Sequence, residues 1–186
     1  MSRLTRKQYV NMIAPIAVAV CKGTGLFPSL MVAQAIIESG DGNSDLARHY
    51  NNHFGIKANR AWKGKAVNMR TREVLSGKDV FIKDGFRAYD TLKEGFADRN
   101  NFLKVNPRYA THGVFKAKNA AEQAEAFQRA GYATDPNYSK LLIAVNKSLV
   151  IPVFEPDFAN VAIRLIAEDQ TLASLDRGFS SSIITA

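Results

Sequence analysis

The sequence predicts a mainly helical α+β fold in which a small β lobe is inserted among helices. Segments with helical periodicity flank a stretch, about residues 53–89, that is rich in Gly, Lys, Val and aromatic residues and contains strand-like fragments. The chain has 186 residues, 46% of them hydrophobic, which suffices for one sizeable core but not for two ordinary domains. We therefore expect one domain over residues 1–150 and a C-terminal helical extension and tail over residues 151–186.

Two helices are expected before the lobe. Thr5 can cap a helix that runs to about Lys22, where the glycines of residues 23–25 end it. Pro28 suits the first turn of a second helix, which continues through Ser39. We expect these two helices to pack together.

A short helix and two strands are expected next. Ser44 can cap a helix that ends near Tyr50. The strand-like fragments Val67–Val74 and Asp79–Tyr89 are separated by the turn residues Ser76 and Gly77, which predicts a hairpin.

Four further helical segments follow the lobe, and the first three begin at residues suited to a helix start. They run from a cap at Asp90 to about Val105, from a cap at Asn119 to about Ala130, from Tyr138 to about Leu149, and over Asp157–Leu175. The last of them lies in the C-terminal extension, and the sequence predicts no role for it.

The chain is basic, with 25 Lys and Arg against 17 Asp and Glu and a formal charge of +8. Such a surface attracts polyanions, including nucleic acid, anionic lipid and bacterial cell wall. The basic residues are scattered, and the densest cluster, Arg3–Lys7, is too short for a nucleic-acid-binding arm. We therefore expect no nucleic-acid partner.

The N-terminal region has a basic start followed by the apolar run Ile13–Val20, as in a short signal peptide. Its apolar residues nevertheless fall on one helical face, Asn11 and Pro15 interrupt the run, and no small-residue cleavage site precedes Gly23. No other segment approaches the length of a membrane span. We expect a monomer, made as a soluble cytoplasmic chain without a signal peptide and without membrane insertion.

Metal and cofactor chemistry have no support in the sequence. His49, His53 and His112 are not spaced as metal ligands, and the single cysteine, Cys21, has no partner for a disulfide or a zinc cluster. No phosphate-binding loop, dinucleotide-binding glycine pattern or serine-hydrolase elbow is present. We predict no metal and no cofactor.

Glu38 is the first candidate for catalysis because it ends a strongly apolar run. A carboxylate that is partly desolvated in this way has a raised pKa and keeps a proton near neutral pH, as a general acid must. Gln34, one turn earlier, shares its helical face. Most glutamates are solvated, so composition by itself favours an ordinary exposed glutamate. The apolar neighbours are Met31, Val32, Ala33, Ala35, Ile36 and Ile37.

A longer pattern around Glu38 favours a catalytic acid over an ordinary exposed glutamate. The run Pro28–Gly40, with Gly42, Ser44 and Leu46-Ala47 after it, resembles the acid-bearing helix of glycoside hydrolase family 73, the peptidoglycan β-N-acetylglucosaminidases. The resemblance continues in order through residues 51–57, 62–64, 71–73, 86–90 and 130–138. Ordered blocks over roughly residues 10–150 are hard to obtain by chance, whereas one block such as Glu-Ser-Gly is weak.

The resemblance implies a lysozyme-like helical body whose β lobe forms a cleft, with Glu38 as proton donor to the glycosidic oxygen. Glu73 matches the family's lobe carboxylate, which acts as a base toward water or as an electrostatic partner of the cationic transition state; the substrate's own acetamido group is the alternative nucleophile. Tyr132 matches a tyrosine near the acid that positions the acetamido group or stabilises positive charge.

Six more residues are predicted to contact substrate, because aromatic faces stack on sugar rings and amides bond N-acetyl or hydroxyl groups. Core packing remains the alternative for Phe54, Tyr89 and Tyr138. The six residues are Gln34, Asn51, Phe54, Trp62, Tyr89 and Tyr138.

The function implied is hydrolysis of β-1,4 bonds of peptidoglycan glycan strands on the N-acetylglucosamine side. A muramidase or lytic transglycosylase, which cuts on the N-acetylmuramic acid side, is the alternative enzyme. An inactive wall-binding module is the alternative of another class, against which the presence of both Glu38 and Glu73 argues. We expect the chain to reach the wall after release, injection or co-export, as a phage or prophage lysin does.

Overall fold

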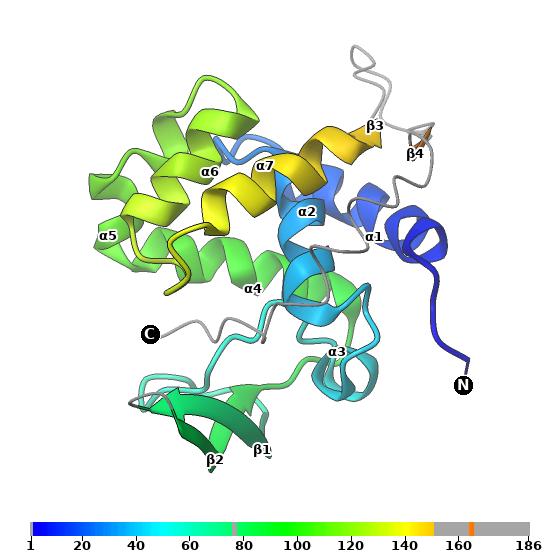
Figure 1. Cartoon of the computed structure of the whole chain (residues 1–186), viewed down its shortest axis with the longest axis vertical. Helices are drawn as coiled ribbons and strands as arrows, with labels where there is room; N and C mark the ends of the chain where they lie inside the picture. Colours follow the sequence, from blue (N-terminus) through cyan, green and yellow to red (C-terminus); the bar gives the residue numbers. More distant parts are fainter. Residues whose placement is uncertain (1, 76–77, 151–163, 166–186) are drawn as a thin grey trace.

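The computed structural model describes residues 2–75, 78–150 and 164–165. Figure 1 shows a helical body with a two-stranded hairpin at one end, in agreement with the mainly helical α+β fold expected from the sequence. None of the helices in the described ranges is long and apolar enough to cross a membrane. The longer helices are α1 (Arg6–Cys21), α2 (Pro28–Ser39), α4 (Leu92–Val105), α6 (Ala120–Arg129) and α7 (Tyr138–Ser148).

Helix α2 runs through the centre of the helical body and contacts α1, α6 and α7 (Figure 1). It is apolar on nearly all sides, as expected of a helix surrounded by others. Pro28 occupies its first turn, where a missing N–H costs nothing. Gly40 ends it in the left-handed conformation, with φ of 56°, and donates its N–H to the carbonyl of Ile36. Glu38 therefore stands in the last turn of a buried helix.

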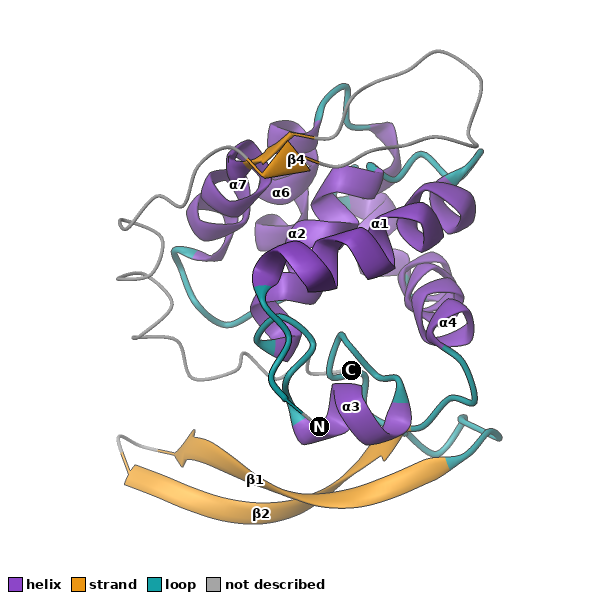
Figure 2. Ribbon diagram, turned by 90° about the vertical axis from the view of Figure 1, so that its right-hand side faces the viewer, coloured by secondary structure: helices purple, strands orange, loops and turns teal. Residues whose placement is uncertain are grey.

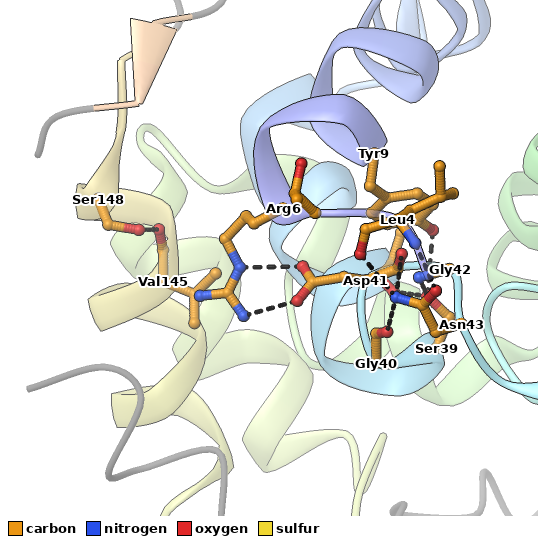
Figure 3. Close-up of polar contacts among 12 residues, drawn as sticks. Leu4, Arg6, Tyr9, Ser39, Gly40, Asp41, Gly42, Asn43, Val145 and Ser148 are labelled. Carbon is orange, nitrogen blue, oxygen red and sulfur yellow. Dashed lines mark hydrogen bonds and ion pairs between the residues drawn. The ribbon is translucent and has the colours of Figure 1, made fainter. Parts of the chain in front are cut away.

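The turn after α2 is tied to the N-terminal segment (Figure 3). The Arg6 guanidinium donates to both carboxylate oxygens of Asp41, at 2.9 and 3.1 Å. The Asn43 side chain accepts from the Leu4 N–H at 2.8 Å and donates to the Leu4 carbonyl at 3.0 Å. These paired contacts fix the chain immediately beyond Glu38.

The hairpin consists of β1 (Ala66–Leu75) and β2 (Lys78–Arg87), which pair in antiparallel fashion with Val67 opposite Phe86. Both predicted strands are present, and their ends differ from the prediction by one or two residues. The short helix α3 (Asp45–Tyr50) lies beside the hairpin in both views (Figures 1 and 2). Its last residue accepts a backbone hydrogen bond from Tyr89, just after β2.

The root of the hairpin is anchored to α4 by a largely buried ion pair. The Arg87 guanidinium lies 2.8 Å from the Asp98 carboxylate, and the two side chains are 8% and 13% exposed. The Tyr89 hydroxyl donates to the same carboxylate oxygen of Asp98, at 2.7 Å. One α4 carboxylate therefore holds two residues at the end of β2.

The caps at Thr5, Ser44 and Asn119 are those predicted, but the cap of α4 is not. Thr91, rather than Asp90, caps α4: its hydroxyl accepts the Glu94 N–H and the Glu94 carboxylate accepts the Thr91 N–H. This reciprocal capping box satisfies two backbone donors at once, which a single Asp cap cannot do. Asp90 instead contacts Lys65 on the surface.

Two short elements after α4 were not predicted. Pro107 ends α4, as expected, but it also occupies the first turn of a new helix, α5 (Pro107–Thr111). A single turn of 3-10 helix, η1 (Val114–Lys116), follows it. Both elements cover the core beside α6.

The predicted C-terminal helix over 157–175 is wrong at two residues. Arg164 and Leu165 form a short strand, β4, that pairs with β3 (Leu149–Val150). The remainder of that predicted helix lies outside the described residues. Because Leu149 is extended within β3, α7 ends one residue earlier than predicted, at Ser148.

Candidate active site

Glu38 is partly exposed, although most of the α2 residues before it are buried. Desolvation raises the pKa of its carboxyl from 4.5 to about 8. A hydrogen bond from Tyr138 favours the charged form and acts in the opposite direction, but desolvation is the larger effect. Glu38 is therefore mostly protonated at neutral pH, while remaining accessible from outside.

A chain of hydrogen bonds runs from Glu38 into the protein. The Tyr138 hydroxyl donates to Oε1 of Glu38 at 3.0 Å, and the Gln34 amide nitrogen donates to the Tyr138 oxygen at 3.1 Å. The Arg99 guanidinium donates to the Gln34 amide oxygen. The last three of these side chains are at most 1% exposed. The acid is thus connected to a buried cation on α4.

Arg99 was not predicted from the sequence. It is one of many basic residues in the chain, and its partner Gln34 lies 65 positions away. The only local signal is its place on the buried face of α4, with Gly95, Phe96, Phe102 and Leu103. A fully buried arginine on an apolar helix face is unusual, but one sequence does not reveal which face is buried.

Tyr132 is completely buried and stacks on Tyr138, with ring centroids 5.6 Å apart and planes 19° from parallel. Burial raises the pKa of its hydroxyl well above 10, the charge of Glu38 raises it further, and the nearby Arg99 guanidinium opposes both. Within the described residues its oxygen has no partner of good hydrogen-bond geometry. The predicted tyrosine is therefore a neutral phenol close to the acid.

Three of the predicted substrate-contacting residues lie together at the root of the hairpin. Trp62 is partly exposed and meets Tyr89 edge to face, with centroids 6.0 Å apart. The Arg87 guanidinium lies 4.3 Å from the centroid of the Trp62 ring. Asn51 donates from its side chain to the Tyr89 carbonyl at 3.0 Å. Trp62 is the most accessible aromatic surface of this group.

Gln34 and Phe54 lie beneath the surface. The single side-chain amide of Gln34 donates from its nitrogen to Tyr138 and accepts with its oxygen from Arg99. Phe54 is 1% exposed and packs edge to face on Phe96 at 4.9 Å. Neither of these two predicted substrate-contacting side chains reaches the surface.

Glu73 lies on β1, where its Cα pairs with that of Val80. Its side chain is outside the described part of the structure, as are those of the neighbouring residues 71–75 and 78–82. The hairpin therefore carries the predicted lobe carboxylate at a known register position on a strand of the lobe.

Two other features of the structure bear on chemistry of a different kind. Within the described residues no three His, Cys, Asp or Glu side chains converge as metal ligands would. A surface hollow of about 550 Å³ lies between the loop after α1 and α4, where it is lined by Thr24, Asn101, Lys104 and Phe115 among others. It contains no carboxylate and none of the residues predicted for the site.

The family model described as mannosyl-glycoprotein endo-beta-N-acetylglucosaminidase, Glucosaminidase, matches residues 14–150. The chain belongs to the Glucosaminidase family. The match covers the helical body from the middle of α1 onward, the hairpin and all nine predicted site residues, and it confirms the resemblance to glycoside hydrolase family 73. Membership also identifies the chain as a glycoside hydrolase.

Curated relatives share this domain. The chain is 34% identical over 146 residues to peptidoglycan hydrolase FlgJ of Vibrio parahaemolyticus, covering 77% of this chain and 47% of that protein. It is 41% identical over 129 residues to exo-glucosaminidase LytG of Bacillus subtilis, covering 64% and 43%. A probable N-acetylmuramidase of Lactococcus lactis is 40% identical over 141 residues, covering 72% and 31%. The chain spans less than half the length of each of these relatives.

Solved structures agree with the fold. The catalytic domain of the autolysin Auto from Listeria monocytogenes is similar with a TM-score of 0.68 and 33% identity, over 80% of this chain and 86% of that one. The Glucosaminidase fold, a helical body with a small two-stranded lobe, is therefore confirmed for this chain.

Proposed function

We propose that the chain hydrolyses β-1,4 bonds of peptidoglycan on the N-acetylglucosamine side, with Glu38 as the proton donor. The observation that carries this proposal is the Glu38 carboxyl itself, whose pKa is raised to about 8 at the end of a buried helix. It stands in a member of the Glucosaminidase family, with relatives named as a peptidoglycan hydrolase and an exo-glucosaminidase. A group that is protonated at neutral pH and open to solvent has the properties of a general acid.

The tyrosines beside the acid have complementary roles in this proposal. As Glu38 gives its proton to the glycosidic oxygen it becomes a carboxylate, and the Tyr138 hydroxyl stabilises that charge by hydrogen bonding. Tyr132 stays neutral and is completely buried, so the proposed role of its phenol is to stabilise the developing positive charge of the sugar from beneath Tyr138, on which it stacks. Neither phenol ionises near neutral pH, so neither competes with Glu38 for the proton.

Glu73 is proposed as the second carboxylate, because it occupies a lobe strand in a family whose resemblance implies a lobe acid. It would activate water or stabilise the oxocarbenium-like transition state. If the acetamido group of the substrate supplies the nucleophile instead, Glu73→Gln will retain much of the activity. Loss of activity comparable to that of Glu38→Gln supports the direct role.

Substrate contact is assigned to the hairpin root and support of the site to the core. Trp62 offers a partly exposed ring, Tyr89 packs against it edge to face, and Asn51 donates to the Tyr89 carbonyl. Gln34 and Phe54, which are buried, shape the site from beneath. Trp62→Ala is expected to raise KM more than it lowers kcat, because stacking acts on bound substrate and transition state alike.

The decisive experiment compares Glu38→Gln with the wild type on purified cell wall. The amide has nearly the same shape but no acidic proton, so the rate should fall by roughly 10²–10⁴-fold. Glu125→Gln is the matched control, because the Glu125 side chain lies on α6, is 57% exposed and pairs with Arg129 rather than with a residue of the candidate site. Wild-type activity in Glu38→Gln would refute the acid assignment.

The bond that is cut is read from the products. New reducing ends of N-acetylglucosamine, identified by mass spectrometry of digested wall, support the proposal. The relative named a probable N-acetylmuramidase favours a second candidate, cleavage on the N-acetylmuramic acid side, which would give muramic or anhydromuramic ends. Wall binding without new reducing ends would indicate a binding module. We propose action as a monomer on the wall, after release, injection or co-export.

A further inference from the structure

We propose that Arg99 is a positioning residue that sets the direction of the hydrogen-bond chain through Gln34 and Tyr138, and so determines which carboxyl oxygen of Glu38 carries the catalytic proton. The proposal rests on the proposed role of Glu38 as general acid. It adds a residue on α4 that touches neither the substrate nor the acid itself.

The direction of the chain follows from the chemistry of arginine. A guanidinium has only donors, so the Gln34 group that faces Arg99 must be its carbonyl oxygen. The other half of the amide, the NH₂ group, must then face Tyr138, 3.1 Å away. The Tyr138 oxygen therefore accepts, and its single hydrogen is left for Oε1 of Glu38 at 3.0 Å.

This direction has a consequence for the acid. Because Oε1 of Glu38 accepts a hydrogen bond from Tyr138, the acidic proton is placed on Oε2, the oxygen that Tyr138 does not contact. If the Gln34 amide were reversed, its oxygen would take the Tyr138 hydrogen. The Tyr138 oxygen would then accept the Glu38 proton, and that proton would be held inward, where the glycosidic oxygen cannot reach it.

Arg99 has no evident role as an ordinary ion-pair partner. Among the described residues no carboxylate pairs with it; NH1 donates to the Asn100 side chain at 3.0 Å, and the rings of Phe54 and Phe127 lie 5.7 and 5.2 Å from its guanidinium carbon. A buried cation without a carboxylate partner carries a desolvation cost. The burial of Arg99 has a functional reason if the guanidinium serves as a fixed hydrogen-bond donor to Gln34.

Two titratable side chains of the described residues influence the protonation of Glu38. In the described part of the chain, the titratable side chains that interact with it are Tyr138 at the start of α7 and Tyr132 just before α7. Both are neutral, and both have a pKa raised well above 10. Arg99 lies on α4 and acts through Gln34. An experiment on this proposal must therefore change the orientation or the donor and acceptor groups of the Gln34 side-chain amide.

Gln34→Glu tests the proposal because it changes the direction of the hydrogen bonds between Gln34 and Glu38 while preserving the shape of the side chain at position 34. The introduced carboxylate accepts from both Arg99 and Tyr138, so the Tyr138 hydroxyl no longer donates to Glu38. Glu38 loses a bond that favours its charged form and gains a negative neighbour, and both changes raise its pKa. We expect kcat to fall about tenfold or more, KM to stay within about twofold, and the alkaline limb of the pH profile to move upward.

Gln34→Met is the matched control, because it removes the hydrogen bonds of residue 34 to Arg99 and Tyr138 without introducing an acceptor for the Tyr138 hydroxyl. Its alkaline limb should stay near that of the wild type, and its kcat should fall less than that of Gln34→Glu. Titration of the Glu38 carboxyl by ¹³C NMR reports the same shift without turnover. Both variants could instead lose kcat equally, with no change in the alkaline limb of the pH profile or in the titration of Glu38. The role of the hydrogen-bond chain would then be merely structural, and the proposal would be overturned.

A second pair of variants keeps the test valid if Gln34→Glu does not fold. Arg99→Lys retains a donor-only group and should keep the wild-type limb, whereas Arg99→Met leaves the amide free to reverse and should lower kcat. Equal kcat in folded Arg99→Lys and Arg99→Met would overturn the proposal. Glu38→Gln distinguishes failure of the proposed function from failure of the positioning role. If Glu38→Gln is active, the assignment of Glu38 as the acid fails. If Glu38→Gln is inactive while Gln34→Glu behaves as the wild type, only the positioning role of Arg99 fails.

Discussion

The Tyr138 hydroxyl lies 3.0 Å from Oε1 of Glu38, although the two residues are 100 positions apart in the chain. The bond joins the first turn of α7 to the last turn of α2. It opposes the effect of desolvation on the pKa of Glu38, so the acidity of this carboxyl depends on the packing of two distant helices.

The first prediction concerns the pH profile. Glu38 must be protonated to act as an acid, and its pKa is raised to about 8 by burial. Activity should therefore persist through neutral pH and fall as the pH rises through about 8. The measurement is kcat on a soluble wall fragment between about pH 3 and 10, where an alkaline limb near the ordinary glutamate value of 4.5 would contradict the prediction.

The second prediction concerns Tyr138→Phe. The substitution keeps the ring that stacks on Tyr132 but removes the hydrogen bond that favours charged Glu38. The pKa of Glu38 should rise, moving the alkaline limb above that of the wild type, and kcat should fall about tenfold, as loss of a hydrogen bond to a charged group allows. Tyr109→Phe is the control, since the Tyr109 hydroxyl bonds to Arg108 instead. An unshifted limb in Tyr138→Phe would count against the prediction.

The third prediction concerns the anchor of the hairpin. Asp98→Ala leaves the buried Arg87 guanidinium without its carboxylate and Tyr89 without its acceptor, which should lower the free energy of unfolding by about 3–5 kcal/mol. Lys65→Ala, which breaks a surface pair with Asp90, should change it little. Urea unfolding monitored by circular dichroism measures both, and equal effects would disprove the distinction.

The fourth prediction concerns acid stability. His53 is buried against Tyr9, whose hydroxyl lies 2.7 Å from its Nδ1, and desolvation lowers the pKa of the imidazole from 6.5 to about 4. The neutral ring is favoured in the folded state, so its contribution is complete above pH 6.5 and is lost as the pH falls toward 4. The loss should reach roughly 3 kcal/mol. The slope of unfolding free energy against pH in this range should be smaller in His53→Gln; an identical slope would assign the acid sensitivity to other groups.

Local rules predicted the helices well because they act over a few residues. Thr5 and Asn119 cap helices as expected, and Pro28 opens α2. The same rules failed where two neighbours compete: Asp90 and Thr91 are both good caps, and the reciprocal bonds with Glu94 decide for Thr91. Pro107 was predicted only to end a helix, although the same residue is well suited to begin one.

The sequence by itself determined the order of most helices and of the hairpin strands and the family resemblance, and it singled out Glu38 as the candidate acid, because capping, periodicity and motif order are properties of neighbouring residues. The tertiary structure decided that Gln34 and Phe54 lie under the site, and that Arg99 stands behind Gln34. Those outcomes depend on which helix faces meet. Contacts between residues 65 and 100 positions apart form only when α2, α4 and α7 pack together, and only that packing desolvates Glu38 enough to keep its proton.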